Sequence, residues 1–332
     1  MPFELPPADR LAIRGLFLER LIPIISDSTW EKTFFSNLFY ESISKFLETP
    51  RDVTRLTNAL SVTFRAAAGE VNPVEFVALE SLRLFRPTVY HVVRENREMF
   101  TGSGPTDYTR PSRDDLNAFH KSWLEQLRQS QPQYAEPVQA LIGRLFPKLQ
   151  SVWGNTNYGS EWEARWRREL RVCSEDIFPV YFSLAVASGD LSNAEMRRLL
   201  AAAQDPSQFA GELLKLKQQV RPDGMTRLSA FLDRQQDYTE SEVPAQHIEP
   251  IISVLLDVGD DVVTPGELGV GFSGVGDNIL IAQVIGQLLK RVEREARFRI
   301  LERAFAGGKA IYTMQEAVVH LGQQQGRYPE SL

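Results

Sequence analysis

The chain has 332 residues, enough for two or three domains, and its 43% hydrophobic and 24% charged residues are typical of a globular protein. A net charge of −6 argues against a nucleic-acid-binding protein that relies on overall positive charge, but leaves a local basic patch open. The single cysteine, Cys173, excludes an intrachain disulfide. Because the sequence contains neither a signal peptide nor an apolar run of roughly 20 residues, we expect a cytoplasmic chain without a membrane span.

Two helices are predicted before residue 49. The prolines of residues 1–7 favour an extended start. A helix over residues 8–21 would place on one face the apolar residues Leu11, Ile13, Leu16, Phe17 and Leu21. Ser28 and Glu31 have the spacing of a capping box, in which each side chain accepts a hydrogen bond from the other residue's backbone amide. They predict a second helix that ends near Thr49.

Residues 49–102 predict two capped helices by the same signal. Thr49 supplies an N-cap hydroxyl, Pro50 takes the first helical position and Asp52 places a carboxylate at the third. Residues 72–75 (NPVE) repeat the pattern with Asn72 as the cap. Apolar residues follow at helical spacing, namely Val53, Leu56, Leu60 and Phe64 in the first helix and Val74, Val77, Leu79 and Leu82 in the second. A third helix is predicted over residues 87–98.

This stretch resembles the KAP family of P-loop NTPases. The family pattern reads roughly TPRDV-R-x-N-x-L, then GEVN-x-x-DF-x-ALE-x-LR-x-F-x-P-x-x-Y and FTG. The chain matches it at Thr49, Pro50, Arg51, Asp52, Val53, Arg55, Asn58, Leu60, Gly69, Glu70, Val71, Asn72, Phe76, Ala78, Leu79, Glu80, Leu82, Arg83, Phe85, Pro87, Tyr90, Phe100, Thr101 and Gly102. Glu75 stands where the family often has Asp. We expect that departure to be harmless, because either carboxylate can close the cap.

Helices continue to be predicted beyond residue 102. Residues 101–113 are rich in Gly, Pro, Ser and Thr and predict a linker. Helical arms follow, one with Phe119, Trp123, Leu124 and Leu127 and another over residues 137–149. Ser160 is expected to cap a helix that holds Arg165, Trp166, Arg167, Arg168 and Arg171, and Asp277 a long helix with Leu280, Val284, Leu288, Val292 and Ala296.

The predicted fold is therefore all-α. We expect a lid-like helical subdomain over residues 1–102, a linker with helical arms over residues 103–159, and a multi-helix domain over residues 160–332.

A P-loop NTPase needs G-x-x-x-x-G-K-[ST] to hold the phosphates, and this sequence contains no such motif. In the family, the phosphate loop, the acidic strand and a membrane-spanning insertion precede a segment similar to residues 1–7 (MPFELPP). The chain thus resembles the C-terminal portion of a KAP protein, beginning where the catalytic core ends. We expect no catalytic residue and no cofactor in this chain, whereas ATP and Mg²⁺ are implied for the intact family protein.

Arg51 is the candidate nucleotide contact. In AAA-type relatives, an arginine at the start of a lid helix, in the sensor-2 position, reaches the γ-phosphate. Arg51 occupies the first turn of a capped helix, where the helix dipole and free amides also favour an anion. The alternative is a solvent-facing or salt-bridged arginine. Arg55, one turn later, is expected to be structural or a second phosphate contact.

Other patterns carry weaker functional hypotheses. Residues 269–274 spell G-x-G-x-x-G, but without a preceding strand they predict a flexible loop rather than a dinucleotide site. Residues 165–168 (RWRR), with Trp153, Tyr158 and Trp162, could stack bases, although Glu161, Glu163 and Glu169 favour a charge-mixed helix with buried tryptophans. We expect no metal site from His91, His120, His247 and His320, no nucleophile at Cys173, and no calcium loop in the acidic turn over residues 257–261.

Three functional hypotheses follow. The resemblance implies ATP-dependent conformational switching, linked in bacterial members to phage exclusion, in which this helical part transmits nucleotide state to partners such as the missing P-loop core. The rival is a stand-alone helical protein-interaction module from a truncated or split gene. The third is a nucleic-acid-binding helical protein that uses the arginine–tryptophan helix.

Overall fold

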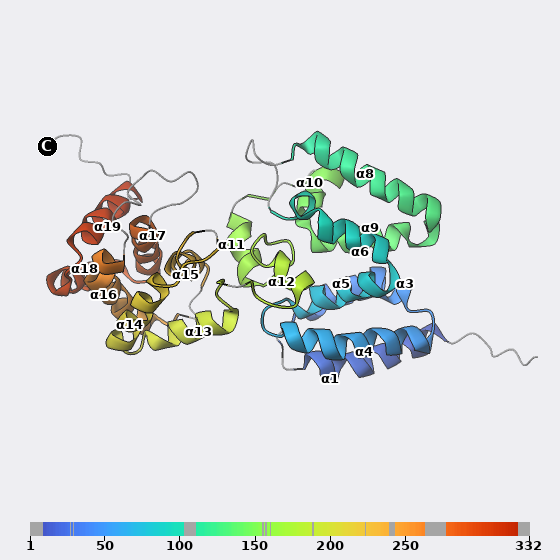
Figure 1. The fold of residues 1–332 in the computed structure, drawn as a ribbon, viewed down its shortest axis with the longest axis horizontal. Coiled ribbons are helices and arrows are strands. Elements are labelled where there is room, and N and C mark those ends of the chain that lie inside the picture. The colour runs from blue at the N-terminus through green and yellow to red at the C-terminus, as the bar shows by residue number, and fades with distance from the viewer. Residues whose placement is uncertain are drawn as a thin grey trace, which may run out of the picture. The chain divides into compact units, whose positions relative to one another are not determined.

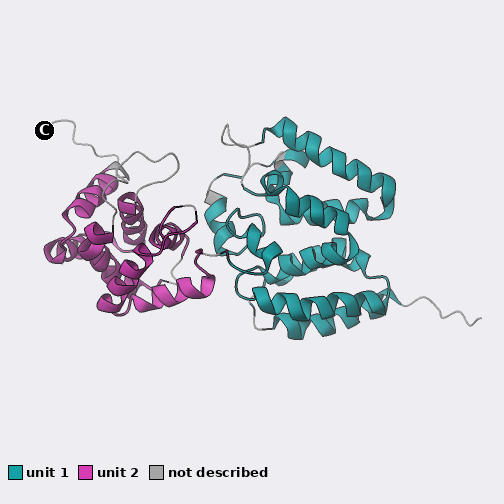
Figure 2. Cartoon of the chain, in the orientation of Figure 1, with its two compact units in different colours: residues 1–186 teal, residues 187–332 magenta. Residues whose placement is uncertain are grey.

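The computed structural model describes residues 9–26, 28, 30–102, 111–154, 156, 158–159, 161–187, 189–222, 224–238, 243–262 and 277–324. Over these residues the secondary structure is helical, without strands, which confirms the all-α prediction. The chain divides into unit 1, Met1–Val186, and unit 2, Ala187–Leu332 (Figures 1 and 2). Both boundaries predicted from the sequence, after residues 102 and 159, fall inside unit 1. None of the helices described is long and apolar enough to cross a bilayer.

Unit 1 contains α1 (Arg10–Ile25), α2 (Lys32–Leu38), a π-helical turn η1 (Phe39–Ile43), α3 (Ser44–Phe46), α4 (Pro50–Ala67), α5 (Pro73–Phe85), α6 (Pro87–Glu95), α7 (Arg97–Phe100), α8 (Arg113–Ser130), α9 (Pro132–Leu145), a 3₁₀ turn η2 (Pro147–Leu149), α10 (Gln150–Trp153), α11 (Glu161–Arg168) and α12 (Phe178–Ser183). Helix α4 packs between α1 and α5, and α8 packs against α9. The rings of Phe17 and Phe35 each stack on Phe39, with centroids 5.5 and 5.6 Å apart.

The helix over residues 8–21 is present as α1, but its buried face differs from the prediction. Asp9 caps it, and the buried residues are Ile13, Phe17, Leu21 and Ile25. Leu11 is 72% exposed, because it lies off the stripe with a four-residue repeat that faces α4. The capping box at Ser28 is wrong. Helix α2 begins at Lys32 after Glu31, without a side-chain cap.

The two helices of residues 49–85 agree well with the sequence. Thr49 and Asp52 form the predicted capping box of α4, with Asp52 N to Thr49 Oγ1 at 3.2 Å and Thr49 N to Asp52 Oδ2 at 2.9 Å. Every predicted core residue of both helices is buried, namely Val53, Leu56, Leu60, Phe64, Val74, Val77, Leu79 and Leu82. The helix predicted over residues 87–98 is interrupted at Asn96, between α6 and α7.

Unit 2 contains α13 (Asn193–Ala202), α14 (Pro206–Lys217), α15 (Arg227–Gln235), α16 (Ala245–Val262), α17 (Asp277–Lys290), α18 (Arg294–Gly307) and α19 (Ile311–Gln324). Helix α16 packs against α14, α17, α18 and α19. The long helix predicted from Asp277 is wrong in length, since α17 ends at Lys290 and Val292 lies between two helices.

The acidic turn predicted over residues 257–261 is also wrong, because α16 continues through it to Val262. Its Asp260 instead accepts hydrogen bonds from the backbone amides of Tyr312, at 3.0 Å, and Thr313, at 2.8 Å, which lie at the start of α19. A carboxylate at this position satisfies amides that have no partner within their own helix.

Candidate functional site

Arg51 lies in the first turn of α4, and its side chain is exposed. Within the described part of the chain, its guanidinium forms no hydrogen bond or ion pair. Arg55 differs. Its Nη1 lies 3.9 Å from Asp52 Oδ1, and its guanidinium lies over the Phe85 ring at 5.6 Å from the centroid. These contacts fix Arg55 against α4 and α5, whereas Arg51 extends from the start of α4 into solvent.

Acidic groups surround the start of α4. Asp52 Oδ2 accepts hydrogen bonds from the amides of Glu48 and Thr49 and from the Thr49 hydroxyl, at 3.3, 2.9 and 2.8 Å. The Glu48 carboxylate accepts a short hydrogen bond from the Tyr134 hydroxyl. Because these carboxylates already occupy the positive end of the helix dipole, a phosphate there would be contacted by the arginine side chain rather than by backbone amides.

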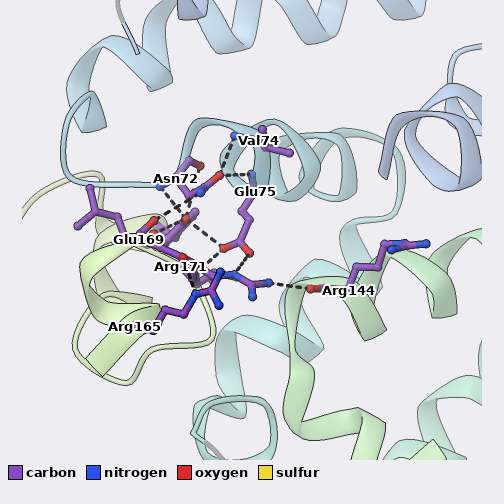
Figure 3. Close-up of polar contacts among 10 residues, drawn as sticks. Asn72, Val74, Glu75, Arg144, Arg165, Glu169 and Arg171 are labelled. Atoms are coloured by element: carbon purple, nitrogen blue, oxygen red, sulfur yellow. Dashed lines mark hydrogen bonds and ion pairs between the residues drawn. The ribbon is translucent and has the colours of Figure 1, made fainter. Parts of the chain in front are cut away.

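A second polar cluster is buried at the start of α5 (Figure 3). Asn72 caps the helix as predicted, accepting from the amides of Val74 and Glu75 at 3.1 and 3.3 Å. The expected role of Glu75 is wrong. Its carboxylate, fully excluded from solvent, accepts from Arg171 Nε at 2.7 Å and from the amide of Val172 at 2.6 Å. A carboxylate at this position therefore joins two distant segments instead of closing the cap.

The segment that meets Glu75 is shaped by Leu170, whose φ of 54° lies in the left-handed region. A side chain there costs about 1–2 kcal/mol. The Leu170 carbonyl accepts from the Asn72 amide at 3.0 Å and from the Tyr181 hydroxyl at 2.8 Å. Arg171 also donates through Nη2 to the Arg144 carbonyl, at 2.9 Å. The turn at Leu170 thus brings Arg171 and Val172 to the Glu75 carboxylate.

Burial sets the protonation equilibria of this cluster. Complete burial raises the pKa of Glu75 above its ordinary value, and the charge of Arg171 and the hydrogen bonds of Val172, Arg171 and Tyr181 offset only part of this effect. Burial also raises the pKa of Tyr181 and of Cys173 well above their ordinary values. Cys173 is therefore a buried thiol that stays protonated at neutral pH.

The arginine–tryptophan helix is α11, and its cap predicted at Ser160 lies outside the described residues. Trp166 is only 1% exposed. Arg165 pairs with Glu169 at 2.7 Å, and Arg167 pairs with Asp176 at 2.9 Å. Paired arginines and a buried tryptophan favour a structural role over base stacking. The G-x-G-x-x-G segment, residues 269–274, lies outside the described residues, as do residues 1–7.

His120 is buried, and the sequence alone does not indicate its role. Its Nδ1 accepts from Trp123 Nε1 at 3.0 Å, so its Nε2 carries the proton and donates to the Met99 carbonyl at 3.0 Å. Lys148, 1% exposed, donates to the carbonyls of Glu98 and Thr101 at 2.7 and 3.0 Å. Two buried side chains thus satisfy the carbonyls at the end of α7. Among the described residues, no group of three or more His, Cys, Asp or Glu side chains could hold a metal ion.

No protein-family model, curated protein or solved structure matches the chain. The resemblance to KAP proteins therefore stays a prediction.

Replacing Glu75 by alanine should destabilise unit 1 by about 3–5 kcal/mol, because Arg171 and the Val172 amide lose a buried partner. Urea unfolding followed by tryptophan fluorescence measures this effect in unit 1 alone, since all five tryptophans lie there. The matched control is Glu19→Ala on the exposed side of α1, expected within about 0.5 kcal/mol of the unsubstituted chain. A loss of less than about 1 kcal/mol in Glu75→Ala would contradict this role.

The pH dependence of unit 1 should contain a contribution from His120. Burial lowers the pKa of His120 from 6.5 to about 4. Since the folded state binds the proton more weakly than the unfolded state, stability is present in full above pH 6.5 and falls as the pH drops towards 4. The loss should reach about 3 kcal/mol. The same fluorescence assay should show a shallower pH dependence in His120→Gln and an unchanged one in His91→Gln, whose side chain is exposed. Identical pH curves for all three proteins would contradict the assignment.

Proposed function

We propose that the chain acts as the helical lid of a KAP-type P-loop NTPase and transmits the nucleotide state of that core to partners. The observation that carries this proposal is the exposed guanidinium of Arg51 at the capped start of α4. The first turn of this 18-residue helix is fixed by the Thr49–Asp52 capping box, so the arginine is presented from a rigid base. Membership of this family would also imply a role in phage exclusion.

In this proposal, the P-loop core binds ATP and Mg²⁺, and Arg51 contacts the γ-phosphate from outside. An arginine supplied by a neighbouring part stabilises the negative charge that spreads over the phosphoryl oxygens during transfer. When the core closes on ATP, the contact between Arg51 and the γ-phosphate would displace the start of α4. Because α4 packs against α1 and α5, movement of the helix would be passed to the rest of unit 1.

The test is ATP turnover with and without a KAP-type core encoded in the same or an adjacent reading frame. We expect no turnover from this chain alone. With the core, Arg51→Ala should lower kcat about 100-fold, the usual effect of removing one transition-state donor. Arg55→Ala, one turn along the same helix, is the matched control and should change kcat less than about threefold.

Two results would contradict the proposal. One is ATP hydrolysis by this chain without a core. The other is an equal effect of the two arginine substitutions on turnover. Arg51 is exposed, so its replacement should leave the free energy of unfolding within about 0.5 kcal/mol, and loss of folding does not confuse the measurement.

A second candidate function is a helical interaction module, which the surface of unit 2 favours. Ile311 and Val318 on α19 are 77% and 56% exposed. They line an apolar surface groove of about 400 Å³ together with Phe305 and Met314. Helix α19 thus both lines the groove and presents apolar side chains that could fill it. A self-complementary face of this kind suits a second copy of the chain, related by a two-fold axis.

Sedimentation velocity over a range of concentrations tests this second candidate. The unsubstituted chain should form a dimer as its concentration rises, and Val318→Glu should remain a monomer, because the new carboxylate would be buried without a partner. Glu316→Gln on the same helix is the control and should dimerise like the unsubstituted chain. A monomer at every concentration would rule out the second copy as the occupant.

A further inference from the structure

A surface pocket of about 400 Å³ lies in unit 1, away from the start of α4. Its walls come from α4, α5, α6 and the end of α12, and include Glu80, Arg83, Tyr90, Arg94, Phe182 and Leu184. None of the hypotheses drawn from the sequence uses this pocket. Its lining combines cationic side chains with aromatic rings. The cations favour an anionic ligand, and the rings favour a ligand with a flat apolar body.

Arg83 is held in place by Glu80, which lies three residues earlier on α5. Its Nε and Nη2 donate to the two carboxylate oxygens of Glu80, at 2.9 and 2.6 Å. Glu80 is 5% exposed, whereas the Arg83 side chain is 37% exposed. A guanidinium has five N–H donors, so the pair orients Arg83 and leaves other donors for a ligand. The pair also cancels the charge of Glu80.

Arg94 gives the pocket its net positive charge. It is exposed on α6, and no carboxylate pairs with it within the described part of the chain. His91, one turn earlier and 56% exposed on its side chain, lies with Nδ1 3.9 Å from Glu95 Oε1. Counting Glu80, Arg83 and Arg94, the pocket has a formal charge of +1.

The remaining wall is aromatic and apolar. The rings of Tyr90 and Phe182 lie with centroids 5.4 Å apart. Burial raises the pKa of Tyr90, so its hydroxyl stays protonated at neutral pH and can donate. Leu184, with φ of 57°, ends α12 in the left-handed region and places its side chain in the wall.

We propose that this pocket binds a small aromatic anion, a phosphate monoester or a carboxylate, with its charged group on Arg83 and Arg94 and its ring against Tyr90 and Phe182. Planar guanidinium groups match both anions, because each can accept two parallel N–H bonds. The rings then offer a flat apolar surface to the body of the ligand. The proposal does not depend on the KAP resemblance, since it needs neither ATP nor a P-loop core.

Binding to the full-length chain is measured by isothermal titration calorimetry with three probes of the same ring. Phenyl phosphate and benzoate distinguish the two anions, and phenol is the uncharged control. We expect saturable binding of at least one of the two anions, with phenol at least about tenfold weaker, a difference of about 1.4 kcal/mol. Arg94→Gln should weaken the bound anion at least about tenfold, and Arg94→Lys should restore part of the affinity.

Arg10→Gln is the matched control, an exposed arginine on α1 that does not line the pocket, and should bind like the unsubstituted chain. Tryptophan fluorescence verifies that each variant unfolds at the same urea concentration. The proposal is overturned if neither anion binds saturably, if phenol binds as tightly as the anions, or if Arg94→Gln binds as well as the unsubstituted chain. ATP turnover is not part of the measurement, so its result is independent of the test of Arg51.

Discussion

The buried ion pair of Glu75 and Arg171 is the interaction on which unit 1 depends. It joins residues 96 positions apart, and the carboxylate is fully excluded from water. Burying two charges is expensive, and their attraction offsets the cost only with additional hydrogen bonds, which Val172 and the Arg144 carbonyl supply. The same cluster holds Tyr181 on α12, next to Phe182 in the wall of the anion pocket. The pocket wall is therefore connected to the buried cluster through Tyr181.

The residues that resemble the KAP pattern divide into two groups by their contacts. Gly69 and Gly102 have φ of 82° and 87°, which side chains rarely adopt, and Asn72 caps α5. The amide of Gly102 donates to the Cys173 carbonyl at 3.0 Å, so the end of the pattern is attached to the segment that follows α11. These residues stabilise the fold. Arg51, at the start of the pattern, contributes no such contact within the described residues and is available to a partner.

Local signals in the sequence predicted the fold well where a few neighbouring residues decide the structure. Thr49, Asp52 and Asn72 act within a single turn, and the apolar spacing of α4 and α5 identified their buried faces. The sequence could not show the partner of Glu75, because Arg171 is distant and lies in a turn whose left-handed residue, Leu170, is not a glycine. The prediction of Ser28 as a cap was wrong although its spacing to Glu31 fits the motif. Helix α2 begins only at Lys32, so Ser28 lies too far before the first turn to cap it. Helix α16 likewise continues through its acidic residues, where Asp260 accepts hydrogen bonds from the start of α19, a tertiary contact that no local pattern shows.

We expect α5 and residues 170–181 to unfold as one cooperative unit because the buried pair joins them, together with α4, which packs against α5. Native-state hydrogen exchange of the full chain, followed by mass spectrometry at increasing urea concentrations, tests this directly. Amides of α5 and of residues 170–181 should lose protection in the same transition and with the same free energy of opening. If residues 170–181 exchange at a clearly lower free energy while α4 and α5 stay protected, the buried pair does not join these segments into one cooperative unit.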